Sequence, residues 1–149
     1  MKLKDAENII EYIIINYKYS KKIVEVGVGK LPQIALGLRE KLPETEIIVT
    51  DLNPRILKQL SNQHIKTAVD DIFSPDMNVY NNSDLIYSIR PPPEVQYYLL
   101  RIAKIIKADL ILRLLTNEHL CVYHTTHKII NYKKTVLHLF KLKESKETR

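Results

Sequence analysis

An acidic residue and two glycines follow one another at the end of an apolar run near the start of the chain. Residues 23–26 are rich in β-branched side chains, which is typical of a strand, and Glu25, Gly27 and Gly29 form the pattern E-x-G-x-G. Glycine has no Cβ, so backbone at these positions lets a ligand approach closely. The pattern becomes helical from Pro32. A strand, a glycine turn and a helix start in this order indicate a nucleotide-cofactor loop.

The residues around the glycines exclude two common nucleotide sites. A dinucleotide fingerprint, G-x-G-x-x-G, would need its third glycine at position 32, where Pro32 has no N–H to offer a pyrophosphate. NAD and FAD are therefore disfavoured. The chain contains no G-x-x-x-x-G-K-[ST] run, and with three glycines in total it has no second phosphate loop. The sequence therefore excludes ATP binding through a P-loop.

A second acid follows the next predicted strand. Asp51 comes directly after the apolar run 46–50 and twenty-two residues after Gly29. An acid at about this spacing accepts hydrogen bonds from ribose hydroxyls in nucleotide sites. The alternative is that Asp51 caps the helix predicted over residues 54–60.

Alternating strands and helices position these residues. Helical periodicity predicts helices over 5–17, 32–41, 54–60 and 92–106, with strands over 23–26, 46–50, 65–69, 85–89 and 110–115. Residues 74–83, rich in Asn, Asp and Ser, are predicted to be a loop. This alternation predicts a Rossmann-like α/β fold with a mostly parallel sheet and helices on both faces. Ligands then lie beyond the carboxyl ends of the strands.

The C-terminal part departs from this alternation. Two β-rich runs, 127–132 and 135–142, flank Lys133 and Lys134, which predicts a C-terminal β-hairpin. Residues 143–149 are charged and have nothing to bury, so we expect a frayed tail. No linker is evident, and residues 1–149 are expected to form a single domain, with residues 1–19 contributing the N-terminal helix.

The ordered motifs resemble those of known proteins. The pattern at Glu25, Gly27 and Gly29, the run Ile-Val-Thr-Asp-Leu-Asn-Pro over 48–54 and the run Val-Asp-Asp-Ile over 69–72 resemble motifs one to three of class I S-adenosylmethionine-dependent methyltransferases. Together with Asp-Leu-Ile-Tyr-Ser-Ile-Arg-Pro-Pro-Pro-Glu over 84–94, the chain resembles an uncharacterised archaeal family of short methyltransferase-like Rossmann proteins. The resemblance covers residues 20–142.

The resemblance implies S-adenosylmethionine as the cofactor. It implies a cofactor site made of Glu25, Gly27, Gly29, Asp51, Asp71 and Ser88. In the methyltransferase pattern the acid after the third strand lies near the adenine amine, and we choose Asp71 over Asp70 for this position. The alternative is that both are solvated loop charges.

The acceptor side follows the fourth predicted strand. Superfamily members that modify base nitrogens often carry Asn or Asp, two prolines and an aromatic residue here. This chain keeps the prolines, but it lacks the amide or carboxylate and the aromatic residue. We therefore expect Arg90, Pro91 and Pro92 to face the acceptor, with the Arg90 guanidinium suited to a phosphate or carboxylate. Alternatively, Arg90 pairs with Glu94 at the surface. Tyr87 either lines the pocket or belongs to the core.

Four further residues have metal-binding side chains. His119, Cys121, His124 and His127 could ligate zinc, but their spacing matches no familiar zinc finger, and alternation along a strand would turn some of them apart. We therefore expect no metal site.

Composition limits the partners. The chain has a formal net charge of +6 and a pI near 9.3. This charge is compatible with an anionic partner such as RNA, and the alternative is non-specific adhesion. Its single cysteine excludes an internal disulfide, and without a leader or a membrane span we expect a cytoplasmic protein. Two hypotheses follow: an S-adenosylmethionine-binding methyltransferase-like domain with an unidentified acceptor, RNA among the candidates, or a non-catalytic Rossmann-like module that binds RNA or a ribonucleoprotein.

Overall fold

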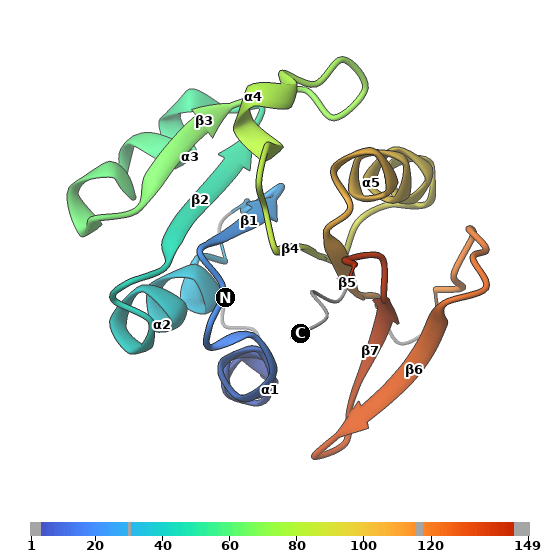
Figure 1. Cartoon of the computed structure of the whole chain (residues 1–149). Coiled ribbons are helices and arrows are strands. Elements are labelled where there is room, and N and C mark those ends of the chain that lie inside the picture. Colours follow the sequence, from blue (N-terminus) through green and yellow to red (C-terminus); the bar gives the residue numbers. More distant parts are fainter. Residues whose placement is uncertain (1–3, 30, 116–117, 145–149) are drawn as a thin grey trace, which may run out of the picture.

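One mixed sheet organises the part of the chain that the structure describes. The computed structural model describes residues 4–29, 31–115 and 118–144. Its strands are β1 (Lys22–Val26), β2 (Glu46–Asp51), β3 (Lys66–Val69), β4 (Leu85–Ile89), β5 (Asp109–Arg113), β6 (His127–Tyr132) and β7 (Thr135–Phe140). They lie in the order β3-β2-β1-β4-β5-β7-β6 (Figure 1).

The strand order places a switch in direction between β1 and β4. From β1 the chain moves outward through β2 to β3 and then returns to β4, which pairs with the other side of β1. Strands β1 to β5 are parallel, so their carboxyl ends meet at one edge of the sheet. This edge, at the switch point, is where open α/β sheets bind ligands. The predicted Rossmann-like, mostly parallel sheet is confirmed.

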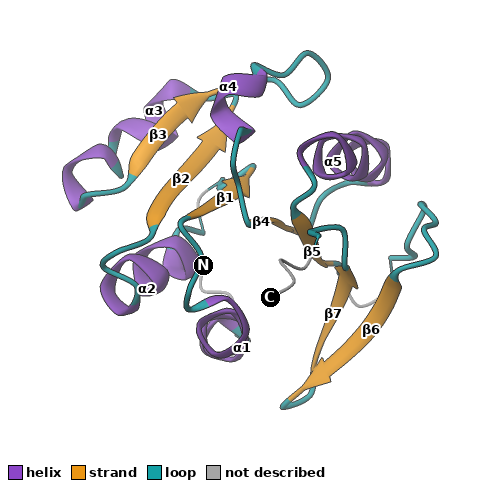
Figure 2. Cartoon of the chain, in the orientation of Figure 1, coloured by secondary structure: helices purple, strands orange, loops and turns teal. Residues whose placement is uncertain are grey.

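Helices cover both faces of the sheet, as predicted (Figure 2). They are α1 (Ala6–Tyr17), α2 (Gln33–Lys41), α3 (Pro54–Lys58), α4 (Met77–Tyr80) and α5 (Pro93–Ile106), with a 3₁₀ turn at Ser61–Gln63 after α3. Neighbouring residues of a strand point to opposite faces, so Ile23 packs with α1 and α2 whereas Val24 packs with α5. None of the helices in the described ranges is long and apolar enough to cross a bilayer.

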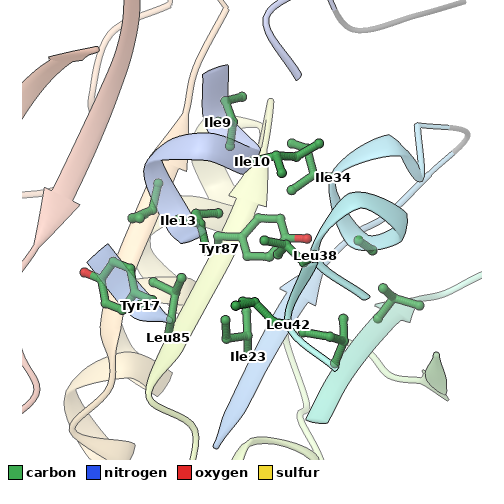
Figure 3. Packing of buried hydrophobic residues seen from close by; sticks show 14 of the residues in the cluster. Ile9, Ile10, Ile13, Tyr17, Ile23, Ile34, Leu38, Leu42, Leu85 and Tyr87 are labelled. Carbon is green, nitrogen blue, oxygen red and sulfur yellow. The ribbon is translucent and has the colours of Figure 1, made fainter. Parts of the chain in front are cut away.

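The first core lies between β1, β4 and the helices α1 and α2. Ile10 of α1 lies next to Ile34 of α2, and the Tyr87 ring of β4 lies between Ile13 and Leu38 (Figure 3). Gly37 of α2 allows this close approach, because a Cβ there would lie 2.5 Å from the Ile10 side chain. The two helices thus form one packed layer on this face.

The prediction of a loop over residues 74–83 is wrong, because this segment contains the one-turn helix α4. The Asp76 carboxylate accepts a hydrogen bond from the Asn78 N–H at 3.0 Å and caps the helix. Tyr80 is fully buried, and its hydroxyl donates to Asp70 at 2.6 Å. The cap and the buried tyrosine stabilise this helix. It is too short to show a helical period in the sequence, so the sequence pattern did not predict it.

The C-terminal hairpin has the predicted position. Strands β6 and β7 pair antiparallel, and β7 pairs antiparallel with β5. Lys133 and Lys134 at the turn both have positive φ, 49° and 69°, the conformation of a type I′ hairpin turn. The predicted frayed tail, 143–149, lies outside the described residues from 145 onward. Lys143 itself is held, because its N–H donates to Asp109 at 2.9 Å.

A buried aspartate ties the chain together at the edge opposite the switch point. Asp109, at the start of β5, is 1% exposed. Its carboxylate accepts hydrogen bonds from the Tyr17 hydroxyl at 2.7 Å and from the Lys141 ammonium at 3.0 Å. The N–H groups of Leu142 and Lys143 donate to its other oxygen. Asp109 therefore joins the end of α1 to the segment after β7, since its carboxylate accepts hydrogen bonds from both.

Removing the Tyr17 hydroxyl tests the contribution of this cluster. Tyr17→Phe keeps the ring in the core but removes one donor to Asp109. A hydrogen bond to a charged group contributes about 1.5–3 kcal/mol, so we expect urea titration to show a free energy of unfolding lower by this amount. Tyr12→Phe is the matched control, because the Tyr12 hydroxyl makes no hydrogen bond with a described residue. Equal losses in both variants would contradict the prediction.

Candidate functional site

A cavity of about 220 Å³ opens at the switch-point edge of the sheet. Its walls come from the ends of β1, β2 and β4, from the segment after β3 and from the start of α5. The lining residues are Val26, Gly27, Thr50, Asp51, Leu52, Asp70, Ile72, Phe73, Ser88, Ile89, Arg90, Pro91, Pro92 and Val95. Six predicted site residues are therefore brought together: Gly27, Asp51, Ser88, Arg90, Pro91 and Pro92. Glu25, Gly29 and Asp71 do not line the cavity.

The glycine loop turns over the end of β2. The N–H groups of Gly27 and Val28 both donate to the Thr50 carbonyl, each at 3.0 Å. Gly27 and Gly29 have φ values of +72° and +55°, which favour glycine because other residues are strained there. Apart from its chain neighbours, a Cβ on either glycine would meet no atom of a described residue within 4 Å. The loop is thus held by hydrogen bonds to β2, and space remains next to the Cα atoms of its two glycines.

Asp51 holds the glycine loop through its side chain. Its carboxylate accepts one hydrogen bond from the Gly29 N–H and another from the Asn53 N–H, both at 2.9 Å. Helix α3 is capped by Asn53, whose side chain accepts from the Arg55 N–H at 3.0 Å. The capping role that was the alternative for Asp51 therefore belongs to Asn53. Asp51 lines the cavity while it connects β2 to the glycine loop.

Glu25 lies in the core behind the loop. Its side chain is 1% exposed, and the Tyr87 hydroxyl of β4 donates to it at 2.6 Å. Burial raises the pKa of the Glu25 carboxyl to about 8, the hydrogen bond from Tyr87 opposes this, and the charge of Asp51 adds to it. Tyr87 is fully buried and packs under α1 and α2 (Figure 3). Of its two interpretations, the structure supports the core residue.

The two acids after β3 have different environments. Asp70 lines the cavity, and it accepts hydrogen bonds from the Tyr80 hydroxyl at 2.6 Å and from the Asp76 N–H at 2.8 Å. Asp71 points into its own turn, where it accepts from the Phe73 N–H at 3.0 Å. Asp70 is therefore the acid at the cavity wall. The hydrogen bond from Tyr80 distinguishes it from Asp71, and no local sequence pattern marks that contact.

Arg90 has an unusual backbone and an unpaired side-chain donor. Its φ is +55°, and its N–H donates to the Arg113 carbonyl at 2.7 Å. The Nε atom is buried and has no acceptor among the described residues. No ion pair joins it to Glu94, which is exposed. Nearby, the Ser88 hydroxyl donates to the Val26 carbonyl at 2.8 Å and fixes β4 against β1 at the cavity floor.

Phe73 is a lining residue that sequence reasoning missed. It is 47% exposed, and its ring meets the edge of Tyr98 of α5 with 4.8 Å between centroids. The residue lies in a turn, so no periodic pattern marked it. Only the packing of α5 against the segment after β3 reveals the contact.

The histidine and cysteine side chains of the C-terminal part have separate partners. His124 bonds to Thr126 at 2.8 Å, and His127 meets His138 of β7 at 2.9 Å. The Cys121 thiol donates to the His119 carbonyl. In the described ranges, no group of three His, Cys, Asp or Glu side chains is arranged to hold a metal ion. His119, Cys121, His124 and His127 are not brought together.

Solved structures with the same fold are S-adenosylmethionine-dependent methyltransferases and related proteins. A putative S-adenosyl-L-methionine-dependent methyltransferase from Methanococcus maripaludis superposes with a TM-score of 0.67 at 13% identity, over 93% of this chain and 85% of that one. The fibrillarin/Nop5p complex gives a TM-score of 0.61 at 13% identity, over 80% and 71%. A mutant of MtNAS in complex with S-adenosylmethionine gives 0.59 at 17% identity, over 91% and 61%. The class of fold is that of the methyltransferase-like Rossmann proteins.

Within this class, the chain belongs to the uncharacterised protein family UPF0146, whose model matches residues 6–142. A UPF0146 protein of Pyrococcus horikoshii is 40% identical over 112 residues, 75% of this chain and 82% of the relative. One of Methanocaldococcus jannaschii is 36% identical over 119 residues, 80% and 82%. These matches confirm the predicted archaeal family.

The buried carboxyl of Glu25 predicts a specific pH dependence. Its pKa is about 8 in the folded chain and near the ordinary 4.5 when unfolded, so the folded state holds one proton more between these values. The free energy of unfolding therefore falls as pH rises from about 4.5 to about 8, by up to about 1.4 kcal/mol per pH unit. Glu25→Gln should remove this component, because the amide still accepts from Tyr87 and does not titrate.

Urea unfolding across this pH range measures the effect. Glu44→Gln, which replaces an exposed acid between α2 and β2, is the control and should keep the wild-type slope. A wild-type slope in Glu25→Gln would show that Glu25 is ionised in the folded chain.

Proposed function

We propose that this chain is a cytoplasmic methyltransferase-like protein that binds S-adenosylmethionine in the cavity at the switch-point edge. The observation that carries the proposal is the glycine loop. Gly27 and Gly29 hold positive φ, leave open space where a Cβ would stand, and lie beside the carboxylate of Asp51. The fold of the methyltransferases and the S-adenosylmethionine bound to one neighbour, MtNAS, support the same cofactor. The single cysteine, Cys121, is a free thiol, which suits a reducing compartment.

The residues present fit this cofactor. Asp51 would accept hydrogen bonds from the vicinal ribose hydroxyls, because its carboxylate oxygens have lone pairs beyond the two backbone bonds they accept. The open face of Gly27 and Gly29 admits the amino-acid portion. We assign the adenine end to the segment after β3, with Asp71, the acid chosen from the sequence, beside the cavity-lining Asp70 and Ile72. Ser88 forms the floor, and Glu25, the acid of the motif, lies in the core with its carboxyl bonded to Tyr87.

The cofactor supplies an electrophilic methyl group, and the described residues supply position. The carboxylates that line the cavity, Asp51 and Asp70, already accept two hydrogen bonds each. Neither is placed as an unengaged base, so holding the acceptor in line would be the main contribution, which for well-oriented groups is large. Arg90, Pro91 and Pro92 form the wall that we assign to the acceptor. The Nε of Arg90, which has no acceptor among the described residues, suits a phosphate or carboxylate there.

The same lack of an unengaged base favours a second candidate. A chain that kept the fold and lost turnover would act as a binding module for RNA or a ribonucleoprotein, consistent with its net charge of +6. Ligand binding and methyl transfer must therefore be measured separately. The binding measurement comes first, because methyl transfer requires that the cavity binds the cofactor.

Binding of S-adenosylhomocysteine tests the cofactor site through thermal unfolding. A ligand that binds only the folded state stabilises it by about 2.7 kcal/mol at 100 times its Kd. For about 150 residues this raises the Tm by about 5–10 °C. We expect this shift in the wild type and its loss in Asp51→Ala, which removes the acceptor for ribose.

Two comparisons make the test specific. The ligand-induced shift is taken within each variant, because Asp51→Ala also removes the bond to the Gly29 N–H and lowers the Tm without ligand. Glu44→Ala, at the opposite edge of the sheet, should keep the wild-type shift. No shift in the wild type at saturating ligand would refute the proposed cofactor, and an unchanged shift in Asp51→Ala would refute the assigned ribose contact.

A further inference from the structure

Three aromatic rings lead from the cavity to the outer face of α5. Phe73 lines the cavity and contacts Tyr98 edge to face, with centroids 4.8 Å apart. Tyr98 in turn contacts Tyr97 edge to face at 5.3 Å. Tyr97 is 59% exposed. The rings form a continuous aromatic strip, because each one touches the next and only the middle one is held by the core.

Basic side chains continue this strip along the helix. Arg101 and Lys104 lie four and seven residues after Tyr97, a spacing that places all three on one face of a helix. Both are exposed, and neither forms an ion pair with a described residue. The axial distance from Tyr97 to Lys104 is about 10 Å, which matches about three stacked nucleotides at about 3.4 Å each. Glu94 is the acidic residue on this helix, and it lies at the end nearest the cavity.

Exposed aromatic rings next to unpaired basic side chains are typical of surfaces that bind single-stranded nucleic acid. Bases stack on exposed aromatic rings, and Lys or Arg follows the phosphates. The surface is the convex side of a helix, so it presents a stacking platform to unpaired bases. RNA is the nucleic acid whose loops and ends regularly offer unpaired bases. The net charge of +6 supplies the long-range attraction.

We propose that Phe73, Tyr98, Tyr97, Arg101 and Lys104 form a binding surface for single-stranded RNA that delivers a nucleotide to the cavity. The proposal rests on the proposed function, since it names the acceptor class for the same cavity. Tyr97 stacks a base outside the cavity, and Arg101 and Lys104 contact phosphates further along α5. An RNA acceptor also carries phosphates, and one of them could accept a hydrogen bond from the Nε of Arg90, which has no partner among the described residues.

Fluorescence anisotropy with the full chain and a labelled, unstructured oligoribonucleotide of about 12 nucleotides tests the surface. That length lies within the about 4–16 nucleotides of single-stranded sites. We expect Tyr97→Leu, which keeps an apolar side chain but removes the ring, to weaken binding about fivefold or more. Between about 50 and 200 mM salt, the double variant Arg101→Gln, Lys104→Gln should lose about 1.4 from the slope of log K against log salt.

Matched controls separate this surface from general basic adhesion. Tyr19→Leu removes another exposed tyrosine that has a lysine beside it, at the opposite edge of the sheet. Lys41→Gln with Lys128→Gln removes two exposed charges elsewhere. Both controls should bind RNA as the wild type does. Equal weakening in the controls, or tighter binding of duplex RNA or of single-stranded DNA of the same sequence, would overturn the proposal.

The outcome is distinguishable from that of the cofactor test. If S-adenosylhomocysteine raises the Tm but the oligoribonucleotide does not bind at low salt, the RNA surface is refuted and the cofactor site stands. If RNA binds and Tyr97→Leu weakens it while S-adenosylhomocysteine gives no shift, the surface stands and the chain is the non-catalytic RNA-binding module.

Discussion

The candidate site depends on one backbone acceptor, the carbonyl of Thr50. Two successive N–H groups, those of Gly27 and Val28, donate to it at 3.0 Å, and this pair of hydrogen bonds draws the chain leaving β1 across the end of β2. The turn has a positive φ at Gly27, which glycine adopts without strain. The carboxylate of Asp51, one residue after Thr50, then reaches the Gly29 N–H. The residues at the end of β2 therefore fix the shape of the glycine loop.

The two edges of the sheet treat polar groups differently. At the amino ends of β4 and β5, Asp84 and Asp109 have their oxygens occupied by backbone N–H groups, a tyrosine and lysines. At the carboxyl ends, Arg90 retains a buried donor without an acceptor among the described residues. Buried polar groups in proteins are nearly always paired. The carboxylates at the amino edge are thus paired, whereas the carboxyl edge keeps a buried donor without an acceptor in the described part of the chain.

Sequence patterns predicted residues from several walls of the cavity, but not from all of them. Glycine type and strand spacing were enough to locate Gly27 and Asp51, because both follow directly from strand ends. The choice between Asp70 and Asp71 was beyond the pattern, since it depends on the Tyr80 hydroxyl reaching back across α4. The contact of Phe73 with Tyr98 joins a turn to a helix, and no local period records such a pair. Glu25 was found for its place in the motif, whereas its burial against Tyr87 is a property of the paired strands.

Arg90 carries two energetic costs in the folded chain, at the wall where we propose that the acceptor binds. A residue other than glycine at φ +55° costs about 1–2 kcal/mol, and a buried donor without a partner costs about 1–3 kcal/mol more. Glycine at this position would avoid both costs, so the penalty belongs to the guanidinium being held at the cavity wall. A ligand oxygen that accepts from Nε would recover the second cost on binding, since it supplies the missing partner. On the proposed function, an anionic or carbonyl-bearing acceptor would therefore relieve a cost at the wall after β4 that an apolar acceptor would leave in place.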